Sequence, residues 1–141
     1  MYSREIKQGR TFVVRLLSGA DILTSLTDFL KKHKIASSMI SGIGAVSKAR
    51  IGFFDGKEYL SIEFNENLEI LTCSGNSSLF QEEPFPHLHI VLGKKNGEAY
   101  GGHLQSGCII GATGEFFIIE VNPPIYRDKD EETGLSLLQL S

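Results

Sequence analysis

The chain has 141 residues, with 14 lysines and arginines against 17 aspartates and glutamates, and its formal net charge at pH 7 is −3. This balance excludes a general electrostatic attraction to nucleic acid or to an anionic membrane, so contact with DNA would need a local basic patch or another subunit. The length predicts a single domain over residues 1–141. Such a domain buries a sufficient core without structural metal, so we expect any bound metal to be functional.

The cysteines and the N-terminal segment give indications of where in the cell the protein is found. Cys73 and Cys108 lie far apart and form no CxxC pair, which indicates reduced core thiols rather than a disulfide framework or a cysteine zinc site. Residues 1–7 contain charges and no apolar run long enough for a signal peptide or a membrane span. We therefore expect a soluble, cytoplasmic protein with no membrane partner.

The first predicted elements are a strand and a helix. Residues 12–17 are rich in β-branched and aromatic side chains and end at a Ser-Gly turn. From Asp21 to Leu30 apolar residues recur at three- and four-residue steps, and basic residues follow at 31–34, which predicts the main amphipathic helix of the chain. His33 lies in that basic cluster and is interpreted as a solvated imidazole near the helix C-terminus rather than as a metal ligand.

After the helix the pattern changes to short strands separated by Gly, Asn and Asp. The predicted strands are residues 38–41, 49–54, 60–64, 68–73, one strand each around His87 and His103, and residues 115–121. Many short strands with one helix indicate an α+β domain whose mostly antiparallel sheet is curved or barrel-like. The acidic stretch 127–134 predicts a solvated loop without chemistry, and the leucines at 135–140 predict a closing segment that packs on the body or on a neighbouring subunit.

Two short phrases contain the candidate metal ligands. Alternate side chains of a strand share a face, so His87 and His89 project together. A turn signal at residues 94–97 folds the chain back and brings His103 alongside this pair. Three neutral imidazoles suit a zinc ion or another divalent transition metal, and they leave a fourth position for water or a ligand. The structural alternative is that each histidine satisfies only local hydrogen bonds.

The glycine pair before His103 supports the metal interpretation. Gly101 and Gly102 allow a backbone to approach closely or to take a positive φ. A ligand that is delivered against a crowded strand face requires one of these two properties.

The order of motifs along the chain carries a family resemblance. It runs from about Arg15 to Leu138 and comprises Arg15, the helix start at 19–23, residues 43–45, 52–55, 68–71 and 75–76, His87 with His89, residues 101–104, Glu115, residues 126–127 and 133–135. This set resembles the PPC-type domain found in plant AT-hook proteins and as stand-alone prokaryotic proteins. The Arg-Gly-Arg-Pro AT-hook of the plant proteins is absent from this sequence.

The resemblance implies a homotrimeric α+β protein with clustered histidines that, in stand-alone members, bind a metal such as zinc. The arrangement is also similar to the three-histidine zinc site of acetolactate decarboxylase, an enzyme with a related barrel-like sheet, although the third histidine here is spaced differently.

Three functions stay open at this point. The first is a metal-dependent enzyme or small-molecule binder, in which Glu69 or Glu115 acts as general base or ligand orienter and Arg15 clamps an anionic substrate. Each of these side chains has a structural alternative, namely a solvent-facing strand position, a strand start or an ion pair. The second is a DNA-associated regulatory or architectural protein. The third is a trimeric interaction module whose metal stabilises the fold.

Overall fold

The computed structural model describes residues 1–140. Within them the chain forms one helix and nine strands: β1 (Lys7–Leu17), α1 (Ile22–His33), β2 (Ser38–Phe54), β3 (Tyr59–Phe64), β4 (Leu68–Phe80), β5 (Glu83–Gly93), β6 (Ala99–Leu104), β7 (Ile109–Asn122), β8 (Tyr126–Lys129) and β9 (Ser136–Gln139).

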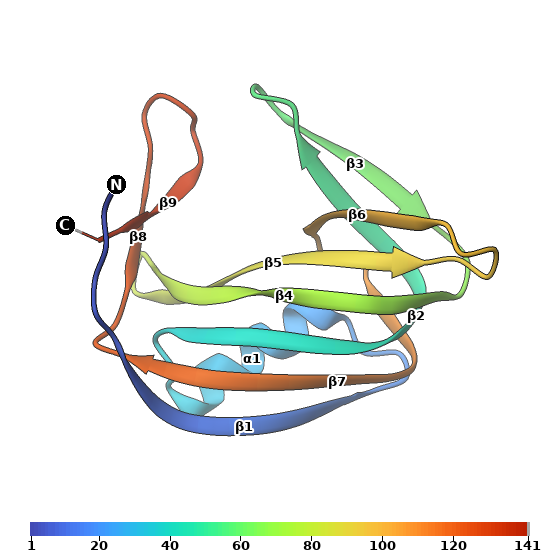
Figure 1. Cartoon of the computed structure of the whole chain (residues 1–141), viewed down its shortest axis with the longest axis horizontal. Helices are drawn as coiled ribbons and strands as arrows, with labels where there is room; N and C mark the ends of the chain where they lie inside the picture. Colours follow the sequence, from blue (N-terminus) through green and yellow to red (C-terminus); the bar gives the residue numbers. More distant parts are fainter. Residues whose placement is uncertain (141) are drawn as a thin grey trace.

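All nine strands belong to one curved sheet, which Figure 1 shows with α1 packed behind it. Strand β2 pairs with β4 through its first part and with β6 through its second part, so β2, β4, β5 and β6 close a ring. The pairings are antiparallel except between β4 and β8. The predicted α+β class with a curved, mostly antiparallel sheet is confirmed. The ring comprises only part of the sheet, because β1, β3, β7, β8 and β9 lie outside it.

Strand β2 corrects the predicted segmentation. The sequence predicts separate strands at 38–41 and 49–54, whereas Ser38–Phe54 is one continuous strand with register shifts around Gly44 and Val46. Such bulges bend a strand and increase its twist. The bend allows one strand to pair with β7 and β4 first and with β3 and β6 afterwards.

The helix forms as its sequence pattern predicts. The Asp21 side chain caps its start by accepting the backbone N–H of Thr24 at 2.9 Å, and Lys34 ends it in the left-handed conformation. The imidazole of His33 is half-buried, with its ring centroid 4.3 Å from that of Phe29, so its interpretation as a solvated side chain is wrong. Stacking on an aromatic ring replaces part of its water contact.

The core lies between α1 and the inner face of the ring. It contains the buried helix residues Ile22, Leu26 and Leu30 together with Leu88, Ile90 and Leu92 of β5. Burial of these alternate β5 side chains fixes the facing of the whole strand, because a one-residue slip would expose them. The other face of β5 therefore points away from the helix.

The cysteines occupy the core as predicted. Cys73 and Cys108 are free and buried, and burial raises the pKa of the Cys73 thiol to about 12. Neither is a reactive thiolate at neutral pH. Among the helices of residues 1–140, none has the length and apolar character needed to cross a membrane.

Candidate metal centre

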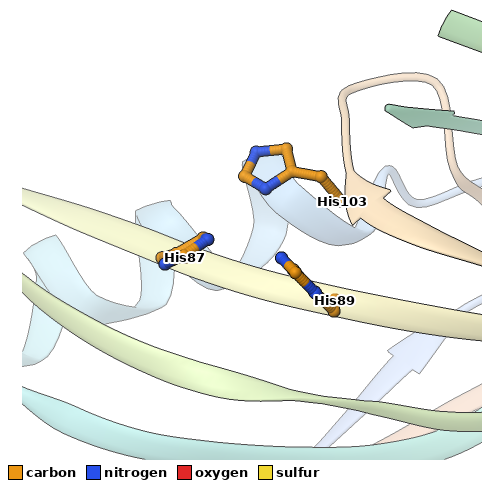
Figure 2. A group of neighbouring side chains, drawn as sticks. All are labelled: His87, His89 and His103. Carbon is orange, nitrogen blue, oxygen red and sulfur yellow. The ribbon is translucent and has the colours of Figure 1, made fainter. Parts of the chain in front are cut away.

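Three imidazoles converge on the outer face of the ring, opposite the helix. Figure 2 shows His87 and His89 projecting from β5 and His103 from β6 towards one another. His103 is directly opposite His89 in the β5–β6 pairing. One ring nitrogen from each histidine lies within 4.8 Å of the others. The predicted clustering is therefore present in the folded chain.

Local backbone chemistry explains how His103 reaches this position. Gly97 takes a φ of 87° in the turn between β5 and β6, a conformation that costs glycine little. At Gly102 a Cβ atom would lie 2.7 Å from the backbone oxygen of Gly52, whereas a Cβ at Gly101 would meet ordinary contacts at 3.5 Å. Neither glycine of the pair has a positive φ. The glycine at 102 is therefore needed for the close approach of two backbones, and not for its backbone conformation.

The electrostatic environment favours the neutral forms of His87 and His103. Burial is the largest cause that lowers the pKa of His87 to about 4, and electrostatic repulsion from Arg127, His103 and His89 contributes the rest. The pKa of His103 is also lowered, by burial first and then by His89. A neutral imidazole offers the lone pair that a metal ion requires.

An unpaired buried atom indicates what the cluster is built to hold. The Nδ1 atom of His103 is buried and has no hydrogen-bond partner within the described residues. Buried polar atoms without a partner are rare and point to an absent ion or water. Nitrogens that share one tetrahedral zinc lie about 3.3 Å apart at Zn–N distances of about 2.0–2.1 Å, so binding of one ion would draw these three nitrogens, now within 4.8 Å of one another, closer together. The residues fit a divalent metal, which when bound supplies Lewis-acid chemistry.

A small cavity opens beside the histidines. Its volume is about 240 Å³, and it is lined by Tyr59, Phe85, His87, His103, Arg127 and residues 134–137. The β2–β3 and β8–β9 hairpins that supply Tyr59 and residues 134–137 rise from the same side of the sheet (Figure 1). The Tyr59 ring lies 5.1 Å from that of His103, between centroids. The three-histidine cluster therefore borders a partly open cavity with room for a small molecule.

Arg127 is the site residue that the sequence interpretation missed. The stretch 127–134 was expected to form a solvated loop without chemistry, but Arg127 lies on strand β8 and its side chain is only 5% exposed. It contacts His87, with 3.4 Å between Nη2 and Nδ1. The sequence contains one signal for this strand. Two prolines precede the segment and favour an extended backbone, and in an extended backbone the side chain of Arg127 points to the face opposite that of Tyr126 and Asp128.

The three other predicted site residues lie outside this cluster in the single chain. Arg15 is opposite Glu115 in the β1–β7 pairing, three to four strand spacings from β5, on the order of 15–20 Å. Glu69 is opposite Gly93, four residues from His89 along β5 and about 13 Å away. All three side chains are exposed. Their roles as general base, ligand orienter and anion clamp stay predictions, because a single chain does not place these side chains next to the histidines.

Comparison with known proteins agrees with this geometry. Residues 3–122 match the family described as the Plants and Prokaryotes Conserved (PCC) domain. The chain belongs to this family. Among solved structures it is similar to a plant- and prokaryote-conserved (PPC) protein of Pyrococcus horikoshii, with 34% identity, a TM-score of 0.90 and coverage of 99% of this chain and 97% of that one. The PPC resemblance drawn from the sequence motifs is confirmed.

Two further solved structures of similar fold have descriptions that mention function. A metal-containing protein from Archaeoglobus fulgidus shares 41% identity with this PCC domain, with a TM-score of 0.91 and 99% coverage of both chains. A protein from Bacteroides thetaiotaomicron, provisionally described as DNA-binding, shares 33% identity with a TM-score of 0.89, covering 99% of this chain and 98% of that one.

The curated relatives are much longer proteins. The bifunctional protein GlmU of a Synechococcus strain is 34% identical over 128 residues, which cover 89% of this chain and 20% of the relative. The chain thus spans about a fifth of the length of the curated relatives that it matches. The matching segment is one part of each of these longer proteins.

Proposed function

We propose that this PCC domain binds one divalent transition metal ion, zinc in the first instance, through His87, His89 and His103, and uses the open coordination position to hold a small molecule. The observation that carries the proposal is the buried, unpartnered Nδ1 of His103 inside a cluster of three imidazoles. The similarity to a metal-containing protein at 41% identity supports it. Free buried cysteines favour a cytoplasmic location.

Zinc is favoured over other metals because of the donor set. Three neutral nitrogens and an open fourth position match the tetrahedral sites that zinc occupies in catalytic proteins. Copper and nickel also accept imidazole ligands, so the metal is assigned by chemistry and availability rather than by affinity.

DNA binding is the alternative, and it has weaker support in this chain. The relative that is provisionally described as DNA-binding motivates it. However, several basic side chains are already engaged in ion pairs with carboxylates: Arg10 with Glu120, Lys31 with Glu83, Arg50 with Glu63 and Lys94 with Glu66. Paired cations neutralise fewer phosphates, and phosphate contacts supply most of the affinity for nucleic acid.

Self-association as a homotrimer is part of the proposal. The strand registers place His89 in one row with Ser74, Ser41, Phe117 and Val13 across β5, β4, β2, β7 and β1. Exposed apolar side chains cover this outer face, namely Val13, Leu17, Met39, Ile43, Leu71 and Phe117. A contiguous apolar face of this kind typically marks a protein interface. Further copies of the chain are the partner that the family resemblance implies, and they would approach the histidines along the same face.

A metal titration tests the proposal. Chelator-treated protein is titrated with zinc by calorimetry, for the wild type, His103→Ala and the control His33→Ala, whose imidazole stacks on the helix. We expect one metal per chain for the wild type and the control. For His103→Ala we expect an affinity more than about 100-fold lower, because even residues that merely support metal ligands account for about 10- to 100-fold.

Two results would contradict the proposal. Absence of stoichiometric metal binding in the wild type would return the histidines to ordinary packing roles. Salt-sensitive binding of duplex DNA that His103→Ala leaves intact, with no metal uptake, would favour the DNA-associated alternative.

A further inference from the structure

Arg127 is a buried cation without a carboxylate partner among residues 1–140. Its Nε donates to Ser78 Oγ at 2.7 Å, its Nη1 to the Ser136 backbone oxygen at 2.7 Å, and its Nη2 to Asn76 Oδ1 at 2.8 Å. Nη2 also lies 3.4 Å from His87 Nδ1. Every acceptor is neutral, so the hydrogen bonds orient the guanidinium but do not neutralise its charge.

An unbalanced buried charge is costly, and proteins seldom retain one without a counter-ion. No aspartate or glutamate among the described residues forms an ion pair with Arg127. The residues that line the adjacent cavity include no aspartate or glutamate. With a divalent ion at the histidines, this part of the molecule would have several positive charges and no negative one, so an anionic ligand would be strongly favoured there.

The donor count of the guanidinium points to where the anion binds. Five N–H groups are available, and the contacts above use four. One N–H of Nη1 therefore has no partner within the described residues. A metal bound to His87 would take the single lone pair of its neutral ring, so the Nη2 contact to Nδ1 would lose its acceptor. One N–H on each terminal nitrogen is then without an acceptor, and a carboxylate, with two oxygens, can accept both.

The cavity wall favours a carboxylate that carries a carbon skeleton. Phe85 lies beside the guanidinium, with 5.7 Å from the Arg127 Cζ to the ring centroid, and Leu135 and Leu137 line the same space. An inorganic phosphate would leave these apolar surfaces uncovered. The volume of about 240 Å³ limits the ligand to a few carbon atoms.

We propose that Arg127 anchors the carboxylate of a small organic acid whose oxygen occupies the open position at the three-histidine metal centre. The assignment rests on the proposed metal-binding function. The β8–β9 hairpin forms the wall of this ligand site, and the bond from Arg127 to Ser136 holds that wall in place. Arg127 thus takes the clamp role for which the sequence suggested Arg15.

The experiment measures carboxylate binding by cobalt-substituted protein. Cobalt(II) occupies imidazole sites, and its visible absorption responds to a new oxygen ligand. Acetate, pyruvate and inorganic phosphate are titrated separately into the wild type, Arg127→Met, Arg127→Lys and the control Lys32→Gln, which removes an exposed cation of α1. Metal stoichiometry, thermal melting and circular dichroism are recorded for each variant. These readouts separate loss of the anchor from loss of the metal or of the fold.

We expect saturable pyruvate binding by the wild type and by Lys32→Gln. Arg127→Met should retain one cobalt per chain and bind pyruvate at least 10-fold more weakly. Arg127→Lys keeps the charge without the fork, so it should bind with intermediate affinity, and it provides the test if Arg127→Met does not fold.

Equal pyruvate affinity in the wild type and in the folded Arg127 variants would overturn the inference while leaving the metal site intact. Tighter binding of phosphate than of acetate or pyruvate would contradict the assignment of an organic carboxylate as the ligand. Absence of cobalt binding in the wild type would overturn the proposed function, and the inference with it.

Discussion

At the scale of single residues, the site depends on close backbone approach as much as on the imidazoles. A Cβ at Gly75 would lie 2.0 Å from the backbone oxygen of His87, and a Cβ at Gly102 would lie 2.7 Å from that of Gly52. Both contacts are shorter than real Cβ atoms tolerate. These glycines let β4 and β2 approach the strands that present the histidines, and they fix where His87 and His103 point.

The two adjacent glycines before His103 give a matched prediction. Gly102→Ala should lower the free energy of unfolding by about 1–3 kcal/mol, the usual cost of overpacking, and should weaken zinc binding because β6 must move away from β2. Gly101→Ala should leave stability within about 0.5 kcal/mol, as surface changes do, and leave zinc affinity unchanged. Denaturant unfolding and calorimetry measure both effects. Equal behaviour of the two variants would refute this account of the glycine pair.

The sequence was informative about the histidines and silent about Arg127 for physical reasons. His87 and His89 lie on a strand with strict alternation, so period two alone placed them on one face. Arg127 is followed in the sequence by a stretch rich in acidic residues, a composition typical of solvated loops. Its burial results from β8 pairing in parallel with β4, a long-range contact that local composition does not reveal.

At the scale of helices and strands, Arg10 connects β1, β7 and α1. Arg10 on β1 forms an ion pair with Glu120 on β7, at 2.7 Å from Nε to Oε2, and its Nη2 donates to the backbone oxygen of His33 at the end of α1. The hydrogen bond from Arg10 lowers the pKa of Glu120. The pair therefore contributes to the pairing of the edge strand β1 and to its contact with the helix.

This pair predicts an acid-dependent loss of stability. Because the pKa of Glu120 is lowered in the folded state, its contribution is present above the ordinary glutamate value of 4.5 and is lost as the pH falls through the folded value. Glu120→Gln should lower the melting temperature slightly at pH 7 and remove part of the decline below pH 4.5. Thermal melts between pH 3 and pH 7 measure this, and an unchanged acid profile in the variant would contradict it.

The boundaries of elements show where local pattern was insufficient. The helix was predictable because its cap at Asp21, its apolar period and its basic end agree. The sequence predicts two strands in place of β2, because the glycines at 42 and 44 are residues that commonly interrupt a strand. In the folded chain they permit a bulge against β7 and β4, a contact that only the assembled sheet provides.

At the scale of the whole molecule, the two faces of the sheet have different roles. The inner face packs on α1 and forms the core, while the outer face combines the histidines with exposed apolar side chains. Because the core residues do not include the imidazoles, we expect the fold to persist without a bound metal. The outer face has no covering layer within the described residues, which is consistent with the proposed trimer.

An aspartate on this face should dissociate the oligomer. Phe117 is 58% exposed and lies in the row that contains His89. Phe117→Asp would place a carboxylate in an apolar interface, and light scattering coupled to gel filtration should show a shift from trimer to monomer. Thr24→Asp introduces the same group on the exposed side of α1 and should leave the trimer intact. A monomeric wild type, or a trimeric Phe117→Asp, would exclude this face as the interface.

The central claim is that three imidazoles bind one metal ion, and X-ray absorption at the zinc edge tests it most directly. For the zinc-loaded wild type the account predicts three imidazole nitrogens at about 2.0–2.1 Å with one further light ligand, and one imidazole fewer in His103→Ala. Sulfur ligands at about 2.3 Å, which only cysteine or methionine could supply, or a spectrum that His103→Ala leaves unchanged, would contradict it.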